Sequence, residues 1–177
     1  MDTDAVLSQY PVGDGPIGIG VNTDLNRIYI TNKQDNNMVV IDGATDQIIA
    51  TIPLLYGPRF LSVNPVTNLI YVAMFSDDGL NNAVAVIDGN TNTVLIPEIP
   101  VGLTPRGVAV NPKTNAIFVA VSDDDRVDVI DGDTHTVVDS IIVGNDPRYV
   151  AVNPDVNQVY VTNTKDNTVT VLGQGPS

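Results

Sequence analysis

Three arginines recur at one position of a repeated motif. They are Arg59, Arg106 and Arg148, in the strings GPRFLSVNP (57–65), TPRGVAVNP (104–112) and DPRYVAVNP (146–154). The whole chain has only eight basic residues against 21 acidic ones, and its net charge is −13. A guanidinium group presents a fork of N–H donors that fits carboxylate and phosphate groups. Converging arginines therefore predict an anion-binding site, to which the next residues, Phe60 and Tyr149, would add aromatic contact.

The same arginines also allow a structural role. Each could pair with a carboxylate or a carbonyl group of the neighbouring repeat and hold the repeats in register. Repetition favours this role, because a structural need recurs in every repeat whereas a ligand site need not. The two roles are compatible with each other.

The elements that position these arginines come from an internal repeat. Pro16, Pro58, Pro105 and Pro147 open four copies at spacings of 42, 47 and 42 residues, and the strings YITN, YVAM, FVAV and YVTN recur at 29, 71, 118 and 160. Each copy holds short runs rich in Val, Ile and Tyr, separated by turn residues, which is typical of strands. We name these strands a, b, c and d. Four antiparallel strands per repeat predict an all-β fold, a β-propeller with four four-stranded blades.

Two further sets of residues recur with the repeat. Asparagines bracket each a–b hairpin, where turn chemistry explains them, and an aromatic residue occupies one position of strand b, where we expect packing between blades. The asparagines are Asn22, Asn64, Asn111, Asn153, Asn26, Asn68, Asn115 and Asn157, and the aromatic residues are Tyr29, Tyr71, Phe118 and Tyr160.

These motifs resemble the YVTN β-propeller repeat family, which includes surface-layer-like and exported proteins. The resemblance covers the whole chain, and YVTN itself stands at 160–163. It implies radial blades around a channel and a location outside the cell or at the cell surface, with the cytoplasm as the alternative. Such propellers commonly have more blades than the four repeats found here.

The repeat register predicts a single domain over residues 1–177, with repeats that start near 16, 58, 105 and 147. The segment AVLSQYPVGDGP (5–16) aligns with TVVDSIIVGNDP (136–147), so we expect a strand d within residues 1–13. That strand would complete the last blade and close a four-bladed ring. The alternatives are an eight-bladed ring of two chains, a strand-exchanged polymer, and a piece of a larger parent protein.

The loops between strands b and c are acidic, and we expect them on the same face as the arginines. These b–c loops span 33–37, 76–82, 122–126 and 164–167. The second is longer than the others, so Asp77, Asp78 and Asn81 are candidate ligand-binding residues. We expect no metal site, because adjacent aspartates on an extended chain point in opposite directions. The weak candidates for one are Asp123, Asp124 and Asp125.

Catalytic signatures are sparse in this sequence. It has no cysteine, one glutamate (Glu98) and one histidine (His135), which we expect on the face opposite the arginines. The acidic charge disfavours nucleic acid, and no stretch is apolar enough for membrane insertion. We therefore expect a non-catalytic binding or scaffold module without a cofactor, which recognises a glycan, a peptide or a small anion. The alternatives are a self-assembling structural protein and, less favoured, an enzyme of lyase or glycosidase type.

Overall fold

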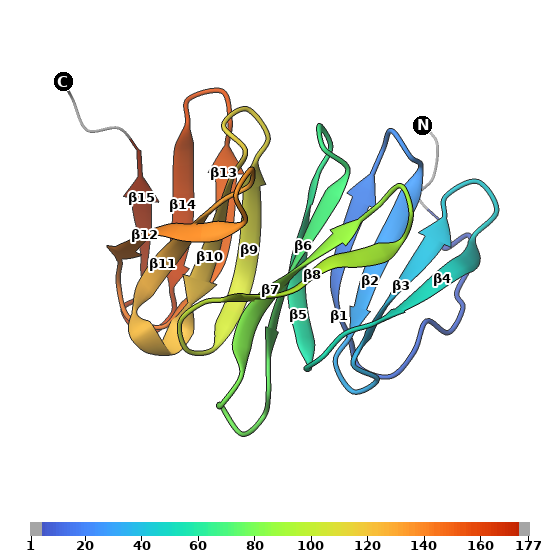
Figure 1. The fold of residues 1–177 in the computed structure, drawn as a ribbon, viewed down its shortest axis with the longest axis horizontal. Helices are drawn as coiled ribbons and strands as arrows, with labels where there is room; N and C mark the ends of the chain where they lie inside the picture. Colours follow the sequence, from blue (N-terminus) through green and yellow to red (C-terminus); the bar gives the residue numbers. More distant parts are fainter. Residues whose placement is uncertain (1–4, 174–177) are drawn as a thin grey trace.

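The computed structural model describes residues 5–173, which form an all-β chain of four antiparallel sheets (Figure 1). The first sheet contains β1 (Pro16–Asn22), β2 (Arg27–Asn32), β3 (Asn37–Asp42) and β4 (Gln47–Pro53). The second contains β5 (Pro58–Asn64), β6 (Leu69–Phe75), β7 (Asn82–Asp88) and β8 (Thr93–Pro100). The third contains β9 (Pro105–Asn111), β10 (Ala116–Val121), β11 (Arg126–Asp131) and β12 (Thr136–Ile142), with the 3-10 turn η1 (Ser122–Asp124) before β11. The fourth contains β13 (Pro147–Asn153), β14 (Gln158–Asn163) and β15 (Thr168–Leu172).

The hairpins between strands a and b show the turn chemistry expected of the repeated asparagines. The last residue of each turn has a positive φ, of 49° at Asn26, 59° at Asn68, 55° at Asn115 and 51° at Asn157. Asparagine takes this left-handed conformation more readily than most residues. At the start of the turn, Asn64 Oδ1 accepts a hydrogen bond from the N–H of Val66 over 3.0 Å. The paired asparagines therefore fix the direction in which each hairpin returns.

The hydrophobic core lies between neighbouring sheets. The first strands β1, β5, β9 and β13 lie next to one another in this order, so each sheet packs face to face on the next. Tyr29 and Tyr71 are fully buried in the first and second of these layers, which confirms for them the packing role predicted from the repeat. The third layer contains Val127, Val159 and Val161.

The four sheets do not close into a ring. In Figure 1 the first sheet lies at one end of the molecule and the fourth at the other. The expectation that a strand within residues 1–13 completes the last sheet is wrong in this structure. Residues 5–13 form no strand, residues 1–4 lie outside the described part, and the fourth sheet has three strands.

The physical reason is the distance between the first sheet, on which this segment is anchored, and the fourth sheet at the other end of the molecule. Asn32 Nδ2 donates to the carbonyl oxygen of Val12, and the N–H of Lys33 donates to that of Gly15, each over 2.8 Å. A segment held at the first sheet does not reach β15 at the far end of its own chain. Among residues 5–173, no helix is long and apolar enough to cross a membrane.

Candidate functional site

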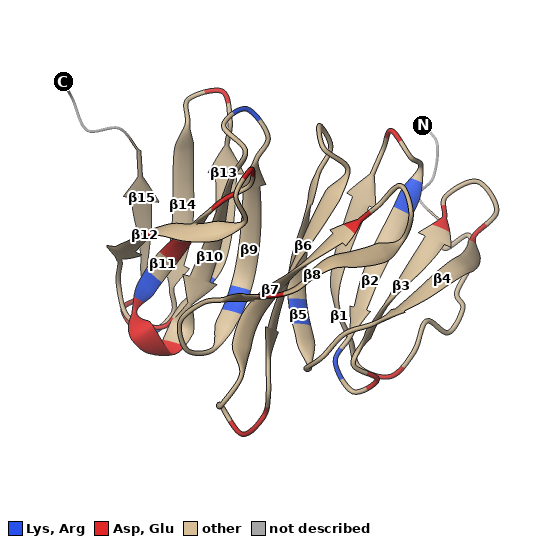
Figure 2. Ribbon diagram, in the orientation of Figure 1, with Lys and Arg blue, Asp and Glu red and all other residues tan. Residues whose placement is uncertain are grey.

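The recurrent arginines line one small hollow, as expected from their place in the repeat. Each follows the proline that opens β5, β9 or β13. The hollow has a volume of about 150 Å³, and we call it the arginine hollow. Its lining residues are Ile17, Arg59, Phe60, Arg106, Arg148 and Tyr149. Figure 2 shows the basic segments of β5 and β9 close together on strands that are otherwise uncharged.

Arg59 and Arg106 share one aromatic ring. The guanidinium carbon of Arg59 lies 4.0 Å from the ring centroid of Phe75, and that of Arg106 lies 5.7 Å from it. Both Nε atoms are buried and have no hydrogen-bond partner among the described residues. Burial, followed by the positive charge of Arg106, lowers the pKa of Arg59 below its usual value. Two like charges are thus held together in a place poor in water, which is costly unless an anion balances them.

The three arginines differ in how closely a carboxylate balances their positive charge. Arg148 has the best partner, since its Nε and Nη2 donate to Asp146 Oδ2 over 3.1 and 2.9 Å. Arg59 Nη2 lies 3.5 Å from Asp77 Oδ1, which also lies 2.8 Å from Lys33 Nζ. Within residues 5–173, Arg106 has no carboxylate partner within 4.0 Å. Both ion pairs stay within one sheet and its connecting segment, whereas Arg106 of the third sheet lies over Phe75 of the second. A role of the arginines in the register between sheets therefore remains a prediction beside the binding role.

In three of the four sheets, an aspartate of the b–c loop has a structural role as a hydrogen-bond acceptor. In each case a carboxylate accepts a hydrogen bond from a backbone amide 21 residues earlier, in the segment that leads into the first strand of the sheet. The pairs are Asp14 N–H with Asp35 at 2.7 Å, Leu103 N–H with Asp124 at 3.0 Å, and Asn145 N–H with Asp166 at 2.7 Å. The equivalent residue of the second sheet is Asp77, which turns instead to Lys33 and Arg59. Asp77 is therefore the loop carboxylate that departs from the repeat and faces the arginines.

The remaining predicted residues of the long loop shape the loop itself. Asp78 accepts hydrogen bonds from the Ser76 hydroxyl and from the N–H of Leu80. The N–H of Asn81 donates to Ser76 Oγ over 3.0 Å. Of the three candidates, only Asp77 contacts an arginine of the hollow. Its side chain is 76% exposed, so it remains accessible to a ligand.

The three aspartates that were weak candidates for a metal site accept hydrogen bonds from neighbouring residues. Asp123 accepts a hydrogen bond from the Thr104 hydroxyl, Asp124 from the Leu103 amide, and Asp125 from the N–H of Asp146. The described part of the chain contains no group of three or more acidic or histidine side chains placed to hold an ion. His135 lies in the turn between β11 and β12 with a φ of 56°, and Glu98 in β8 accepts a hydrogen bond from Tyr56.

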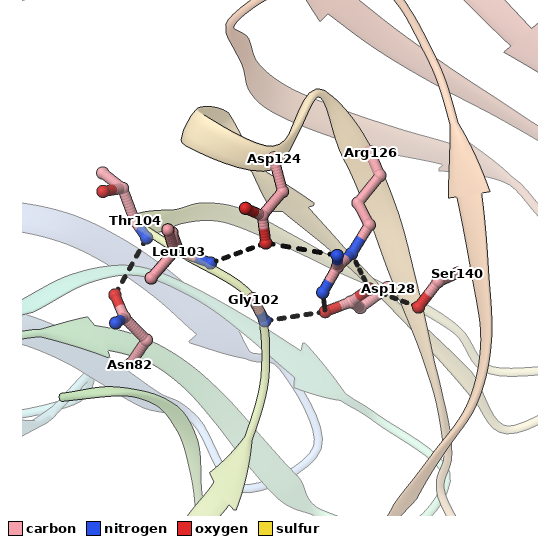
Figure 3. Close-up of polar contacts among 8 residues, drawn as sticks. All are labelled: Asn82, Gly102, Leu103, Thr104, Asp124, Arg126, Asp128 and Ser140. Carbon is pink, nitrogen blue, oxygen red and sulfur yellow. Dashed lines mark hydrogen bonds and ion pairs between the residues drawn. The ribbon is translucent and has the colours of Figure 1, made fainter. Parts of the chain in front are cut away.

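A polar network that the sequence analysis missed holds the segment between the second and third sheets (Figure 3). Asp128 on β11 is 1% exposed. It accepts hydrogen bonds from the Gly102 amide at 2.8 Å, from Arg126 Nε at 2.7 Å and from the Ser140 hydroxyl at 2.7 Å. Burial opposes its ionisation, but these donors outweigh it and hold the pKa of Asp128 below its usual value. A charged residue inside the string RVDVID, two places after an arginine, was the available signal, since such residues share one face of a strand.

Comparison with known proteins shows the fold and no family. No family model matches the chain, and no curated protein does. Among solved structures, Kuenenia stuttgartiensis hydrazine synthase matches with a TM-score of 0.76 and 24% sequence identity. The match covers 90% of this chain and 46% of that one, so the chain spans less than half the length of its structural neighbour. At this identity the likeness extends to the fold alone.

Proposed function

We propose that the chain is a non-catalytic binding module, built from propeller blades, that holds an anionic group in the arginine hollow. The observation that carries this proposal is the pair Arg59 and Arg106. Both have buried Nε donors without a partner among residues 5–173, and within those residues the only carboxylate within 4.0 Å of either guanidinium is Asp77, at 3.5 Å from Arg59. A carboxylate or phosphate bound in the hollow would supply the missing negative charge and accept hydrogen bonds from the terminal nitrogens of the guanidinium groups.

The dimensions of the hollow define the part of the ligand that enters it. A volume of about 150 Å³ holds one carboxylate or phosphate group and little more. The rest of a glycan or peptide would lie over the exposed ring of Tyr149 and the loop that carries Asp77. This arrangement suits the terminal carboxylate of a peptide or the uronate of an acidic glycan. Asp77 would leave Arg59 when the ligand binds.

The non-catalytic part of the proposal is supported by the state of the nearby carboxylates. Asp123 and Asp124 accept hydrogen bonds from the segment before β9, and Asp146 pairs with Arg148 on β13. None of these interactions prepares a carboxylate as an acid or base for a group in the hollow. The structural neighbour is named as an enzyme, and at 24% identity we carry none of its activity over. The location outside the cell is a proposal that comes from the YVTN-like repeats.

The test is calorimetric titration with four probes: acetate, inorganic phosphate, galacturonate and a short peptide with an unblocked carboxyl terminus. We expect at least one probe to bind, and Arg106→Gln to weaken its affinity at least about tenfold, as befits the loss of a charge-assisted pair. The matched control is Lys113→Gln, which removes a surface ammonium group whose polar partner among residues 5–173 is Asp155. Equal affinity of the wild type and Arg106→Gln, or no heat with any of the four probes, would refute the proposal.

A further inference from the structure

The outer face of the first sheet is apolar and uncovered. Ile19 on β1 is 68% exposed and Val21 is 55% exposed. At the same repeat position as Ile19, Leu61 and Val108 are only 8% and 6% exposed, because the preceding sheet covers them. The strand that carries this face, PIGIGVN, has no charged residue. It has the composition of an interface between sheets, yet no sheet of the described chain covers it.

The outer face of the fourth sheet is uncovered in the same way. Tyr160 is 37% exposed, whereas its repeat equivalents Tyr29 and Tyr71 are fully buried. Val169 and Val171 on β15 are 58% and 52% exposed. Their equivalents in the first sheet, Met38 and Val40, are fully buried against the second sheet. Neither β14 nor β15 carries a charged residue.

These two faces are the opposite halves of one contact that the chain makes three times. In the first layer, Tyr29, Met38 and Val40 pack in the same cluster as Leu61 of the next sheet. The fourth sheet presents the Tyr29 side of this contact, and the first sheet presents the Leu61 side. Because each uncovered face is complementary to the other, the partner that fits both is a second copy of the same chain.

A series of hydrogen bonds between asparagines, which we call the asparagine ladder, supports the same partner. At each junction between sheets, a buried asparagine at the end of the first strand donates its amide to the turn asparagine of the next sheet. The donors and acceptors are Asn22 with Asn68 at 2.7 Å, Asn64 with Asn115 at 2.8 Å, and Asn111 with Asn157 at 2.8 Å. The next donor is Asn153, which is exposed although its three equivalents are fully buried. The acceptor position left over is Asn26, which is also exposed and lies at the other end of the chain.

The segment before the first sheet supplies an outer strand. Residues 5–12 form no strand, and Val6 and Leu7 are 89% and 94% exposed. In repeat register this segment aligns with β12, which pairs with β11. The corresponding inner neighbour is β15, whose outer edge is unpaired among the described residues. On a second chain, the segment would lie beside β15 once the first sheet of that chain packs on the fourth sheet.

We propose that two copies of this chain join head to tail around a two-fold axis, so that each covers the outer face of the other's fourth sheet. In each junction Asn153 donates to Asn26 of the other copy, and residues 5–12 of one copy pair with β15 of the other. The two junctions are identical, and together they close eight sheets into a ring. Because each copy carries a charge of −13, added salt should strengthen the association.

The first test is the mass of the 177-residue chain by light scattering after size exclusion, at several concentrations and two salt levels. We expect twice the chain mass of 18.8 kDa. Ile19→Asp should weaken the dimer at least about tenfold, because it buries a charge in the junction. The control is Val66→Asp, which changes an equally exposed valine (72%) in a hairpin turn away from both faces. A monomer at every concentration, or an open series of masses, would overturn the two-copy ring.

The second test reports the pairing of individual strands. The chain has no cysteine, so Gln9→Cys and Thr170→Cys can be made separately and mixed under oxidising conditions. By the register of β12 on β11, where Ser140 lies opposite Asp128, residue 9 should lie opposite residue 170. We expect a disulfide between the two different variants and none when Gln9→Cys is mixed with Val66→Cys. Equal yields in the two mixtures would rule out the strand pairing even if the mass were that of a dimer.

Discussion

The ring of Phe60 on β5 meets the ring of Tyr149 on β13, with 4.8 Å between their centroids, although β9 of the third sheet lies between these strands. The same repeat position in the third sheet is Gly107, which has no side chain to stand between them. Its backbone lies so close to β13 that an added Cβ would be 2.7 Å from the carbonyl oxygen of Arg148. The glycine therefore sets both the spacing of β9 and β13 and one wall of the arginine hollow.

Gly107→Ala should destabilise the fold by about 1–3 kcal/mol, because the new Cβ meets backbone atoms that cannot move without shifting a strand. Urea unfolding followed by far-ultraviolet circular dichroism measures this loss. Gly57→Ala is the control, since its nearest contact would be the flexible side chain of Lys33 at 3.2 Å. If both variants unfolded at the same urea concentration as the wild type, the close approach at Gly107 would not matter to stability.

Asp128→Asn should lower the free energy of unfolding by about 3 kcal/mol. The carboxylate is 1% exposed and receives donors from Arg126, Ser140 and Gly102, so its loss leaves buried donors and a guanidinium without a full partner. Chemical unfolding of both proteins at neutral pH gives the difference. Asp155→Asn, which breaks an exposed pair with Lys113, should leave the unfolding midpoint almost unchanged. A comparable loss in Asp155→Asn would show that burial is not the cause.

The same carboxylate makes part of the stability depend on pH. The pKa of Asp128 is lower in the folded chain than in the unfolded chain, so its contribution is complete above the unfolded pKa and falls as the pH drops through the folded pKa. Unfolding midpoints of the wild type and Asp128→Asn should therefore differ at pH 6 and converge when the pH is taken from about 4 to 2. A constant difference over this range would mean that Asp128 is not ionised in the folded chain.

The asparagine ladder predicts unequal effects of one substitution at two repeat positions. Asn64 is fully buried and donates to Asn115 across a junction between sheets, so Asn64→Ala should cost about 1–3 kcal/mol. Asn153 stands at the equivalent position but is exposed, and in dilute, monomeric protein Asn153→Ala should have a much smaller effect. Thermal unfolding of the two variants at equal concentration tests this contrast.

The sequence predicted those features that recur in every repeat. The left-handed turn asparagines and the strand starts depend on local chemistry; the strands start at Pro16, Pro58, Pro105 and Pro147. Such local features can be predicted from one copy of the repeat and checked against the next copy. The gathering of the arginines around one hollow followed from the same register. Features that occur once were harder to find. Asp128 has apolar or uncharged equivalents in the other sheets, so a comparison of the repeats did not indicate its hydrogen-bond network.

The position of residues 5–13 could not be predicted because it depends on how strongly the sheets curve. Sequence alignment with β12 correctly indicates which segment resembles an outer strand, but it does not say whether the first and fourth sheets of one chain meet. The role of Asp77 was hidden for a related reason. Its equivalents Asp35, Asp124 and Asp166 bind backbone amides, and only the folded loop shows that Asp77 faces Arg59 instead.

Arg106→Gln tests whether the arginine hollow is maintained at a cost to stability. Arg106 has no carboxylate within 4.0 Å among residues 5–173, and its charge opposes that of Arg59, whose pKa it helps to lower. Without ligand, the variant should therefore be as stable as the wild type or more stable by about 0.5 kcal/mol. Arg126→Gln is the opposite case, because it removes the partner of a buried carboxylate and should destabilise the fold. Urea unfolding of the two variants in a buffer without phosphate or carboxylate separates them. If Arg106→Gln lost as much stability as Arg126→Gln, Arg106 would serve the fold, and a binding site would no longer be needed to explain it.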